Sequence, residues 1–154
     1  MKSVLLFFLL LFLIFLDQLT KHLVLYGFRF KWGFFEITLV YNEGSAFGLK
    51  LLKNDEYIVV NSIILFLFTL FIFYRGNRNR YMKDLYNFCL VFILSGGIGN
   101  IIDRIFHGKV IDFFYIYNFP VFNLADVFIT LGIGMLIMIF FREEKKFQEN
   151  SPPP

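Results

Sequence analysis

Long apolar blocks, separated by short polar or charged segments, dominate the chain. Four such blocks run over residues 4–26, 57–74, 84–103 and 122–141. A helix needs about 20 predominantly apolar residues to cross the roughly 30 Å of hydrocarbon in a bilayer, and these blocks are close to that length or longer. The pattern therefore predicts an all-α membrane protein with four transmembrane helices.

One segment between the first two blocks follows a different pattern. Residues 34–41 are rich in aromatic and β-branched side chains with partial alternation, which is typical of a strand, and turn-forming residues follow at 42–44. We expect a small β-sheet segment here, lying on the membrane surface with its aromatic side chains in the interface.

Basic residues at the ends of the blocks predict the orientation. The linker between the second and third blocks carries Arg75, Arg78 and Arg80, and Lys83 follows it. Short loops rich in Lys and Arg stay in the cytoplasm, and the basic residues after position 141 agree. Both termini are then expected in the cytoplasm, with residues 27–56 and 104–121 on the outer face.

Composition supports one polytopic membrane domain over residues 1–154. Hydrophobic residues make up 58% of the chain, above the roughly 45–50% of soluble domains. The net charge of +3 comes with basic residues that flank apolar blocks, so no nucleic-acid partner is expected. The first block resembles a secretory signal, but no small-residue cleavage site follows it, and it is interpreted as a retained span. Residues 145–154 are expected to form a disordered tail.

Ionisable residues inside the blocks are candidates for function, because a charge in a membrane is costly. Asp17 and Lys21 stand four apart in the first block, in the order that favours an ion pair on one helix face. Such a pair either snorkels at the outer end of the span or stabilises the helix bundle.

The segment 42–48 is rich in small and polar residues, among them Asn42 and Gly44. Its glycines permit close approach of the backbone to a substrate or a helix end, and a simple turn back into the bilayer would also explain them.

The third block closes with a glycine-rich segment over residues 95–104. Gly96 and Gly99 leave room for a neighbouring helix to pack closely. Asn100 and Arg104 lie one turn apart on a shared face, with Asp103 beside them. An organised polar network is favoured over a plain helix terminus.

Asp112 and Asp126 are the two acids on the outer side with apolar neighbours. Burial of Asp112 would raise its pKa by desolvation. Asp126 follows Asn123 by three residues, a spacing typical of a capping box at a helix start, which is compatible with a chemical role. Two carboxylates brought close would share one proton, so one can act as general base on a water while the other polarises a scissile carbonyl.

Other catalytic constellations have little support. His22 and His107 have no evident nucleophile partner, Cys89 lies inside an apolar block, and no zinc-ligand spacing is present. Neither a metal nor an organic cofactor is expected.

Five motifs in order, over nearly the whole chain, resemble those of lipoprotein signal peptidase (signal peptidase II), the bacterial membrane aspartic peptidase. They cover residues 17–21, 42–48, 96–104, 110–113 and 122–126. The resemblance implies that Asp112 and Asp126 are the catalytic dyad and that Asp103 is structural. Asp17 and Lys21 are also expected to be structural. It also implies supporting roles around the substrate for Asn42, Gly44, Asn100, Arg104 and Asn123.

The same resemblance implies the substrate. It is a lipoprotein precursor with a diacylglyceryl group on the cysteine after the cut, and cleavage just before that cysteine releases the signal peptide. The site would lie near the outer face of the bacterial cytoplasmic (inner) membrane, within reach of a substrate that arrives through lipid. A monomer in contact with membrane lipids is expected.

Two other function classes fit the sequence less well. A small transporter or assembly partner would have polar residues along a path through the bilayer, whereas here they cluster at one depth. A membrane lipid phosphatase needs several cationic phosphate ligands, and Arg104 alone supplies little.

Overall fold

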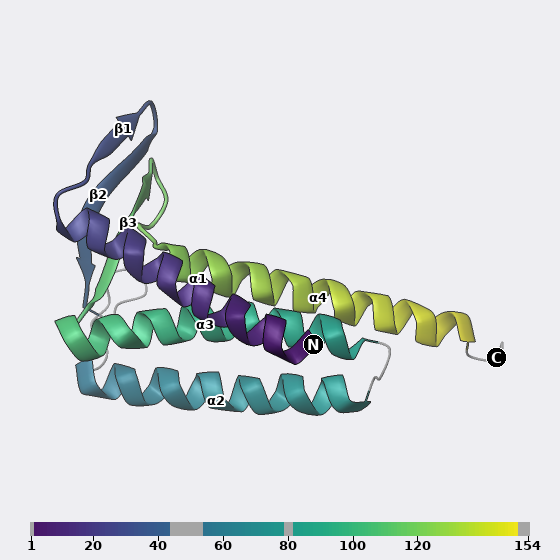
Figure 1. Cartoon of the computed structure of the whole chain (residues 1–154). Helices are drawn as coiled ribbons and strands as arrows, with labels where there is room; N and C mark the ends of the chain where they lie inside the picture. The colour runs from purple at the N-terminus through teal and green to yellow at the C-terminus, as the bar shows by residue number, and fades with distance from the viewer. Residues whose placement is uncertain (1, 44–53, 79–81, 151–154) are drawn as a thin grey trace.

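The computed structural model describes residues 2–43, 54–78 and 82–150. Within these ranges four long helices lie side by side, and a small antiparallel sheet stands at one end of them (Figure 1). The helices are α1 (Lys2–Leu25), α2 (Asn54–Arg78), α3 (Lys83–His107) and α4 (Leu124–Asn150).

Helix α3 is the centre of the bundle, because α1, α2 and α4 all pack against it. One apolar cluster between α2, α3 and α4 is built around Ile72, Tyr86 and Leu136. A second cluster joins α1, α3 and α4 through Leu13, Val91 and Phe128. The helices are therefore held by apolar packing around α3, which fixes the position of the other three.

Glycines on α3 set how closely its neighbours approach. A methyl group at Gly96 would overlap the carbonyl oxygen of Ala125 on α4, and one at Gly99 would overlap the carboxylate of Asp17 on α1. Small residues let helix backbones approach in this way in membranes. The close packing predicted for Gly96 and Gly99 is confirmed.

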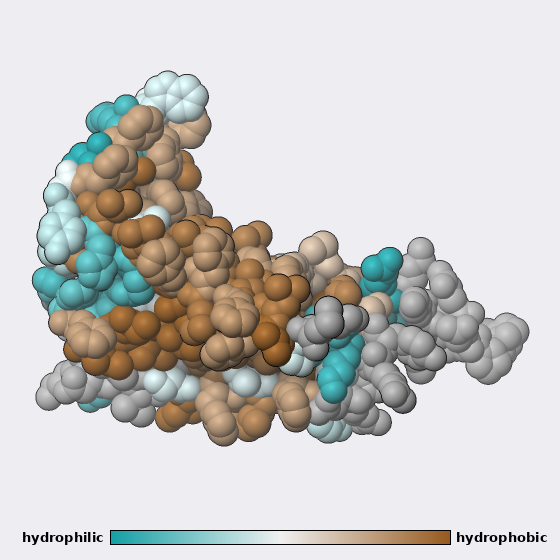
Figure 2. All heavy atoms as spheres, in the orientation of Figure 1, coloured by the Kyte–Doolittle hydropathy of each residue, from teal (hydrophilic) through white to brown (hydrophobic). Residues whose placement is uncertain are grey.

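Apolar side chains cover the outside of the helices as well as the inside. Figure 2 shows a broad hydrophobic surface over the bundle, and exposed Leu, Ile and Phe side chains occur along α1, α2 and α4. Three of the helices described, α1, α3 and α4, are long and apolar enough to cross a membrane. Among the residues of α2 whose side chains the structure describes, the apolar part is shorter and covers Ser62–Gly76.

The sheet consists of β1 (Phe30–Trp32), β2 (Phe35–Asn42) and β3 (Val110–Ile116), in that order and antiparallel. Gly33 adopts a positive φ of 57° in the turn between β1 and β2, a conformation that glycine reaches without strain. The strand predicted over 34–41 is confirmed as β2.

Two boundaries differ from the sequence-based expectation. Helix α4 continues to Asn150, so the prediction of a disordered tail is wrong for residues 145–150, while residues 151–154 lie outside the described chain. Glu, Lys and Gln are good helix formers, and they continue the helix beyond its apolar part. Helix α3 also runs on to His107, which places Asp103 and Arg104 inside it.

Candidate active site

Pairing of β3 with β2 places Asp112 beside Asn42. Asp112 lies directly opposite Val40, and Asn42 is two residues further along β2, on the same face of the sheet. The Asn42 amide (Nδ2) donates a hydrogen bond of 2.9 Å to Oδ2 of Asp112. The sheet therefore supplies the first carboxylate and its first hydrogen-bond donor.

A tight return of the chain brings the start of α4 to the same place. After β3 the backbone turns at Asn118, whose φ is 61°, and residue 122 pairs back with residue 114. The Phe114 N–H donates to the Phe122 carbonyl at 2.8 Å, and the Phe122 N–H donates to the Phe114 carbonyl at 3.1 Å. This pairing fixes Asn123 next to Asp112 as the chain enters α4.

Asn123 and Asp126 form the predicted capping box. The Asp126 N–H donates to Oδ1 of Asn123 at 3.0 Å, and the Asn123 N–H donates to Oδ2 of Asp126 at 3.2 Å. The amide nitrogen of Asn123 remains available, and it donates to Oδ1 of Asp112 at 2.7 Å. One side chain thus caps the helix and bridges the two acids.

Asn100 completes this arrangement from α3. Its Nδ2 donates to Oδ1 of Asp126 at 2.9 Å. Its Oδ1 accepts from Asn123 Nδ2 at 3.0 Å and from the ammonium of Lys21 at 3.1 Å. A flipped amide would point its NH2 group at two other donors, so these neighbours determine which end of Asn100 faces Asp126.

Lys21 is the centre of a buried ion network behind the two acids. Its ammonium lies 2.8 Å from Asp17 Oδ2 and 2.8 Å from Asp103 Oδ2, and all three side chains are almost completely buried. The pair on α1 therefore does not snorkel to the surface, and the alternative expectation of a role in the bundle fits its position.

Both carboxylates of the network also bind backbone N–H groups of other elements. Asp17 Oδ1 accepts from the Ala125 N–H at 2.9 Å, which satisfies a free donor in the first turn of α4. Asp103 Oδ2 accepts from the Ile111 N–H in β3 at 3.1 Å. The network thus joins α1, α3, β3 and the start of α4.

Gln18 belongs to the network and was missed in the sequence analysis. Its Nε2 lies within 3.2 Å of Asp17 Oδ2 and of the Gly99 carbonyl, and 3.1 Å from Asp103 Oδ1. The signal was present, since Gln18 is a polar residue between Asp17 and Lys21 in a predominantly apolar helix.

Two further candidates have a different outcome. Arg104 is half-buried one turn after Asn100, and its Nη1 lies 3.4 Å from the Asn100 carbonyl. Gly44 and the rest of the segment 44–53 lie outside the described residues, so the prediction for Gly44 remains a prediction.

Burial dominates the electrostatics of Asp112. The side chain is 2% exposed, and loss of solvation raises its pKa to about 6. The charge of Asp126 raises it too, while the hydrogen bonds from Asn42 and Asn123 and the charge of Lys21 lower it. Asp112 is therefore held among neutral amide donors, and it can gain or lose a proton near neutral pH without breaking an ion pair.

Ligands for a metal ion do not gather here. In the part of the chain that the structure describes, no three His, Cys, Asp or Glu side chains lie together as they would around a metal.

Comparison with known proteins gives a consistent result. A family model described as signal peptidase (SPase) II matches residues 9–142. The lipoprotein signal peptidase of Helicobacter pylori (strain ATCC 700392 / 26695) is 36% identical over 150 residues, covering 94% of this chain and 93% of that protein. The lipoprotein signal peptidase of Caldicellulosiruptor bescii is 39% identical over 144 residues, covering 89% of this chain and 92% of that protein.

Solved structures show the same fold. One, described as a bacterial membrane enzyme, superposes with a TM-score of 0.79 at 25% identity, covering 96% of this chain and 94% of the other. A second bacterial membrane enzyme gives a TM-score of 0.74 at 26% identity, covering 88% and 91%.

Proposed function

The chain belongs to the signal peptidase II family, the lipoprotein signal peptidases that remove signal peptides from prolipoproteins, and from this premise we propose that Asp112 and Asp126 are its catalytic pair. The observation that carries the proposal is the bridge made by Asn123. Its Nδ2 binds Asp112 while its Oδ1 and its backbone N–H bind Asp126, so the two carboxylates are fixed relative to one another. They come from different elements, a strand and a helix start, and have no other evident reason to meet.

The different surroundings of the two acids support different roles. Asp112 is the more buried and has the raised pKa, so we assign it the shared proton. Asp126 lies in the first turn of α4, where the helix dipole stabilises a negative charge, so we assign it the role of general base. Asp126 would take a proton from the attacking water while Asp112 gives its proton to the carbonyl oxygen of the scissile bond. As the C–N bond breaks, Asp126 passes its proton to the leaving amine nitrogen and Asp112 takes a proton back from a hydroxyl of the tetrahedral intermediate, which forms the carboxyl product and returns the pair to its one-proton state.

The surrounding polar residues serve this pair. Asn42 donates a hydrogen bond to Asp112, and Asn100 donates one to Asp126. Each bond restricts the rotation of the carboxylate that accepts it. Arg104 lies one turn from Asn100 at the same end of α3, where it can meet polar groups of the substrate. We assign Asp17, Lys21 and Asp103 to positioning, because their contacts run to backbone N–H groups and to Asn100.

We further propose how the molecule lies in the membrane. Helix α2 is the fourth span, both termini are cytoplasmic, and the sheet lies on the outer face. Two features support this orientation: the basic linker between α2 and α3, and the exposed aromatic residues in and beside the sheet, such as Trp32, Phe34 and Tyr117. A monomer would then receive a lipid-modified precursor sideways from the bilayer and cut before the modified cysteine.

Replacing either aspartate tests the catalytic assignment. Asp112→Asn and Asp126→Asn should each lower cleavage of a purified, lipid-modified precursor by at least about 100-fold, because general acid–base catalysis contributes at least that much. The cut site is read by mass spectrometry, and thermal unfolding in detergent micelles shows whether each variant is folded. Asp84→Asn, an exposed change at the far end of α3, is the matched control.

Two results would overturn the proposal. Near-normal cleavage by either folded variant would remove the aspartate pair from the chemistry. Equal cleavage of a precursor that lacks the diacylglyceryl group would contradict the substrate. Asp103→Asn separates chemistry from structure. It should lower the unfolding temperature, while the folded enzyme keeps much more of its cleavage rate than Asp112→Asn or Asp126→Asn does.

A further inference from the structure

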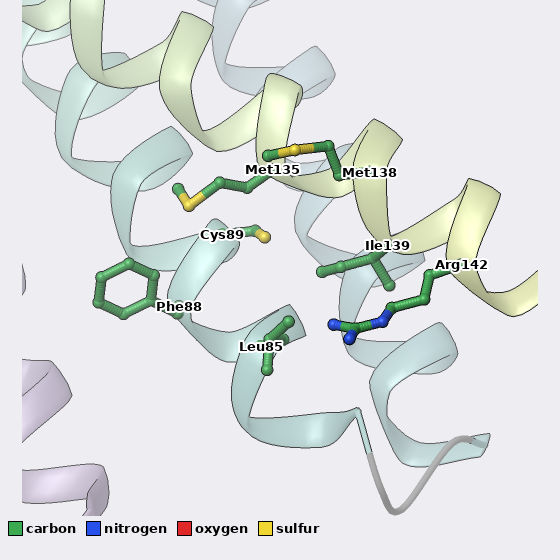
Figure 3. A pocket seen from close by; sticks show the side chains of 7 residues that line it. All are labelled: Leu85, Phe88, Cys89, Met135, Met138, Ile139 and Arg142. Carbon is green, nitrogen blue, oxygen red and sulfur yellow. The ribbon is translucent and has the colours of Figure 1, made fainter.

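A second site lies at the opposite end of the bundle from the aspartates. A cavity of about 350 Å³ opens between α3 and α4, and its walls are apolar except for one cation. Leu85 and Cys89 line it from α3, and Met135, Met138 and Ile139 line it from α4. Figure 3 shows these side chains along a groove, with the guanidinium of Arg142 at one end beside Leu85 and Ile139. We propose that this groove binds one acyl chain of an anionic phospholipid, whose phosphate is held by Arg142.

The charge of Arg142 identifies the kind of head group. Arg142 makes no hydrogen bond or ion pair with any residue whose side chain the structure describes, and its side chain is exposed. By contrast, Arg75 at the same end of the bundle is paired with Glu143 at 2.5 Å and lies over the ring of Phe140. An unpaired guanidinium beside an apolar groove is complementary to a phosphate with an attached hydrocarbon chain, because its planar donors match phosphate oxygens.

The position of Arg142 along α4 fits the depth of a lipid head group. The apolar, membrane-crossing part of this helix is Leu124–Glu144, so Arg142 lies at its very end. The lining residues on α4 run from Met135 to Arg142, which is about 10 Å along a helix and points toward the middle of the bundle. A phosphate at Arg142 therefore leaves its acyl chain lying along the groove.

The size of the groove decides against a peptide helix inside it. A 10 Å length of helix with a diameter of about 10 Å fills roughly 800 Å³, more than twice the cavity. An acyl chain is one carbon wide and fits between the two helices. Two flexible methionines in the wall suit such a ligand, since their side chains adapt to irregular apolar shapes.

The inner leaflet supplies the ligand under the proposed orientation. The groove lies at the end of the bundle that carries the basic α2–α3 linker, which is the cytoplasmic end in the topology proposed above. Anionic lipids are concentrated there, and each nearby Arg or Lys contributes about 1 kcal/mol to binding them. The lipid would be a bound component of the enzyme, remote from its catalytic pair.

Native mass spectrometry of the purified full chain tests the site. Phosphatidylglycerol and phosphatidylcholine with the same acyl chains are titrated separately, and the masses of the complexes are recorded. We expect tighter binding of phosphatidylglycerol, and we expect Arg142→Gln to weaken it about fivefold, the effect of one cation near a membrane surface. Lys83→Gln removes a charge at the same end of α3 without touching the groove, and it should leave binding unchanged.

A second variant tests the groove itself. Met138 is 64% exposed, so Met138→Trp is tolerated sterically and narrows the groove. It should reduce binding of both lipids, while cleavage of the precursor in detergent stays at the wild-type rate for every variant. Equal binding of the two lipids, unchanged binding by Arg142→Gln, or a complex with a peptide or a second copy of the chain in place of lipid would overturn the proposal. Loss of precursor cleavage by Asp112→Asn is a separate readout, so the two proposals fail independently.

Discussion

A single asparagine shows how local structure and chemistry combine in this molecule. Asn123 caps α4 by accepting from the Asp126 N–H, and the same side chain donates to Asp112. Capping by itself is worth about 1 kcal/mol, and any of several small polar residues can supply it. A hydroxyl has one donor hydrogen, whereas the Asn123 amide has two, and it donates to both Asp112 and Asn100 while its oxygen accepts from the helix. The residue type is therefore determined by the bridge between the acids more than by the cap.

The raised pKa of Asp112 predicts a pH-dependent stability. In the unfolded chain the carboxyl titrates near 3.8, and in the folded protein near 6, so the folded state binds the proton more tightly. This contribution to stability is complete below about pH 4 and is lost as the pH rises through about 6. It amounts to about 3 kcal/mol.

Comparison with a residue that cannot titrate measures this contribution. Thermal unfolding in detergent micelles at pH 4 and pH 8 should show that the wild-type protein loses stability relative to Asp112→Asn as the pH rises. The same pH dependence in both proteins would show that Asp112 titrates normally in the folded state.

Helix packing brings the site residues together at the scale of elements. Asn100 reaches Asp126 and Lys21 at the same time because α3 lies unusually close to both α1 and α4. Gly96 and Gly99 permit that approach, since a Cβ at either position would overlap atoms of the neighbouring helix. The buried ions then connect α1 to the first turn of α4 and α3 to β3.

A methyl group at Gly96 should therefore disturb the site from outside it. Gly96→Ala forces α4 away from α3 and should lower the free energy of unfolding by about 1–3 kcal/mol, with a parallel loss of precursor cleavage. Gly134→Ala is the matched control, because a Cβ at Gly134 meets nothing within 4 Å. Unfolding temperatures and cleavage rates of the two variants provide the measurement. Equal effects of the two changes would mean that close contact between α3 and α4 is not needed.

At the scale of the whole molecule, the polar residues of the candidate site are separated from the apolar surface of the helices. The sheet and the aspartates lie at one end of a bundle whose outer surface is largely apolar (Figure 2). A precursor can therefore remain in the lipid while its cleavage point meets the polar end. This arrangement depends on the direction in which the bundle crosses the membrane.

Cysteine labelling tests that direction. In a Cys89→Ala background, Tyr117→Cys should react with a membrane-impermeant maleimide in right-side-out vesicles, because Tyr117 is exposed beside the sheet. Lys83→Cys, at the start of α3, should react only in inverted vesicles. The reverse pattern would place the aspartates on the cytoplasmic side and contradict the proposed topology.

The sequence by itself determined the four helices, the strand β2 and the cap at the start of α4. Apolar blocks of membrane length predicted the helices, because a bilayer imposes a length on any span. The spacing of Asn123 and Asp126 predicted the cap, because a capping box is a local structure. Neither prediction requires knowledge of what lies nearby in space.

Only the tertiary structure decided which polar residues act together. Asp17 and Lys21 looked like a local pair, and their link to Asp103, Asn100 and the start of α4 depends on three helices packing. The role of Gln18 depends on packing for the same reason, since two of its three partners, the Gly99 carbonyl and Asp103, lie on α3. The bridge from Asp112 to Asp126 likewise needs β3 to pair with β2 and the chain to turn back at Asn118. Contacts between residues distant in sequence follow from packing and strand register, which the periodicity of one segment does not encode.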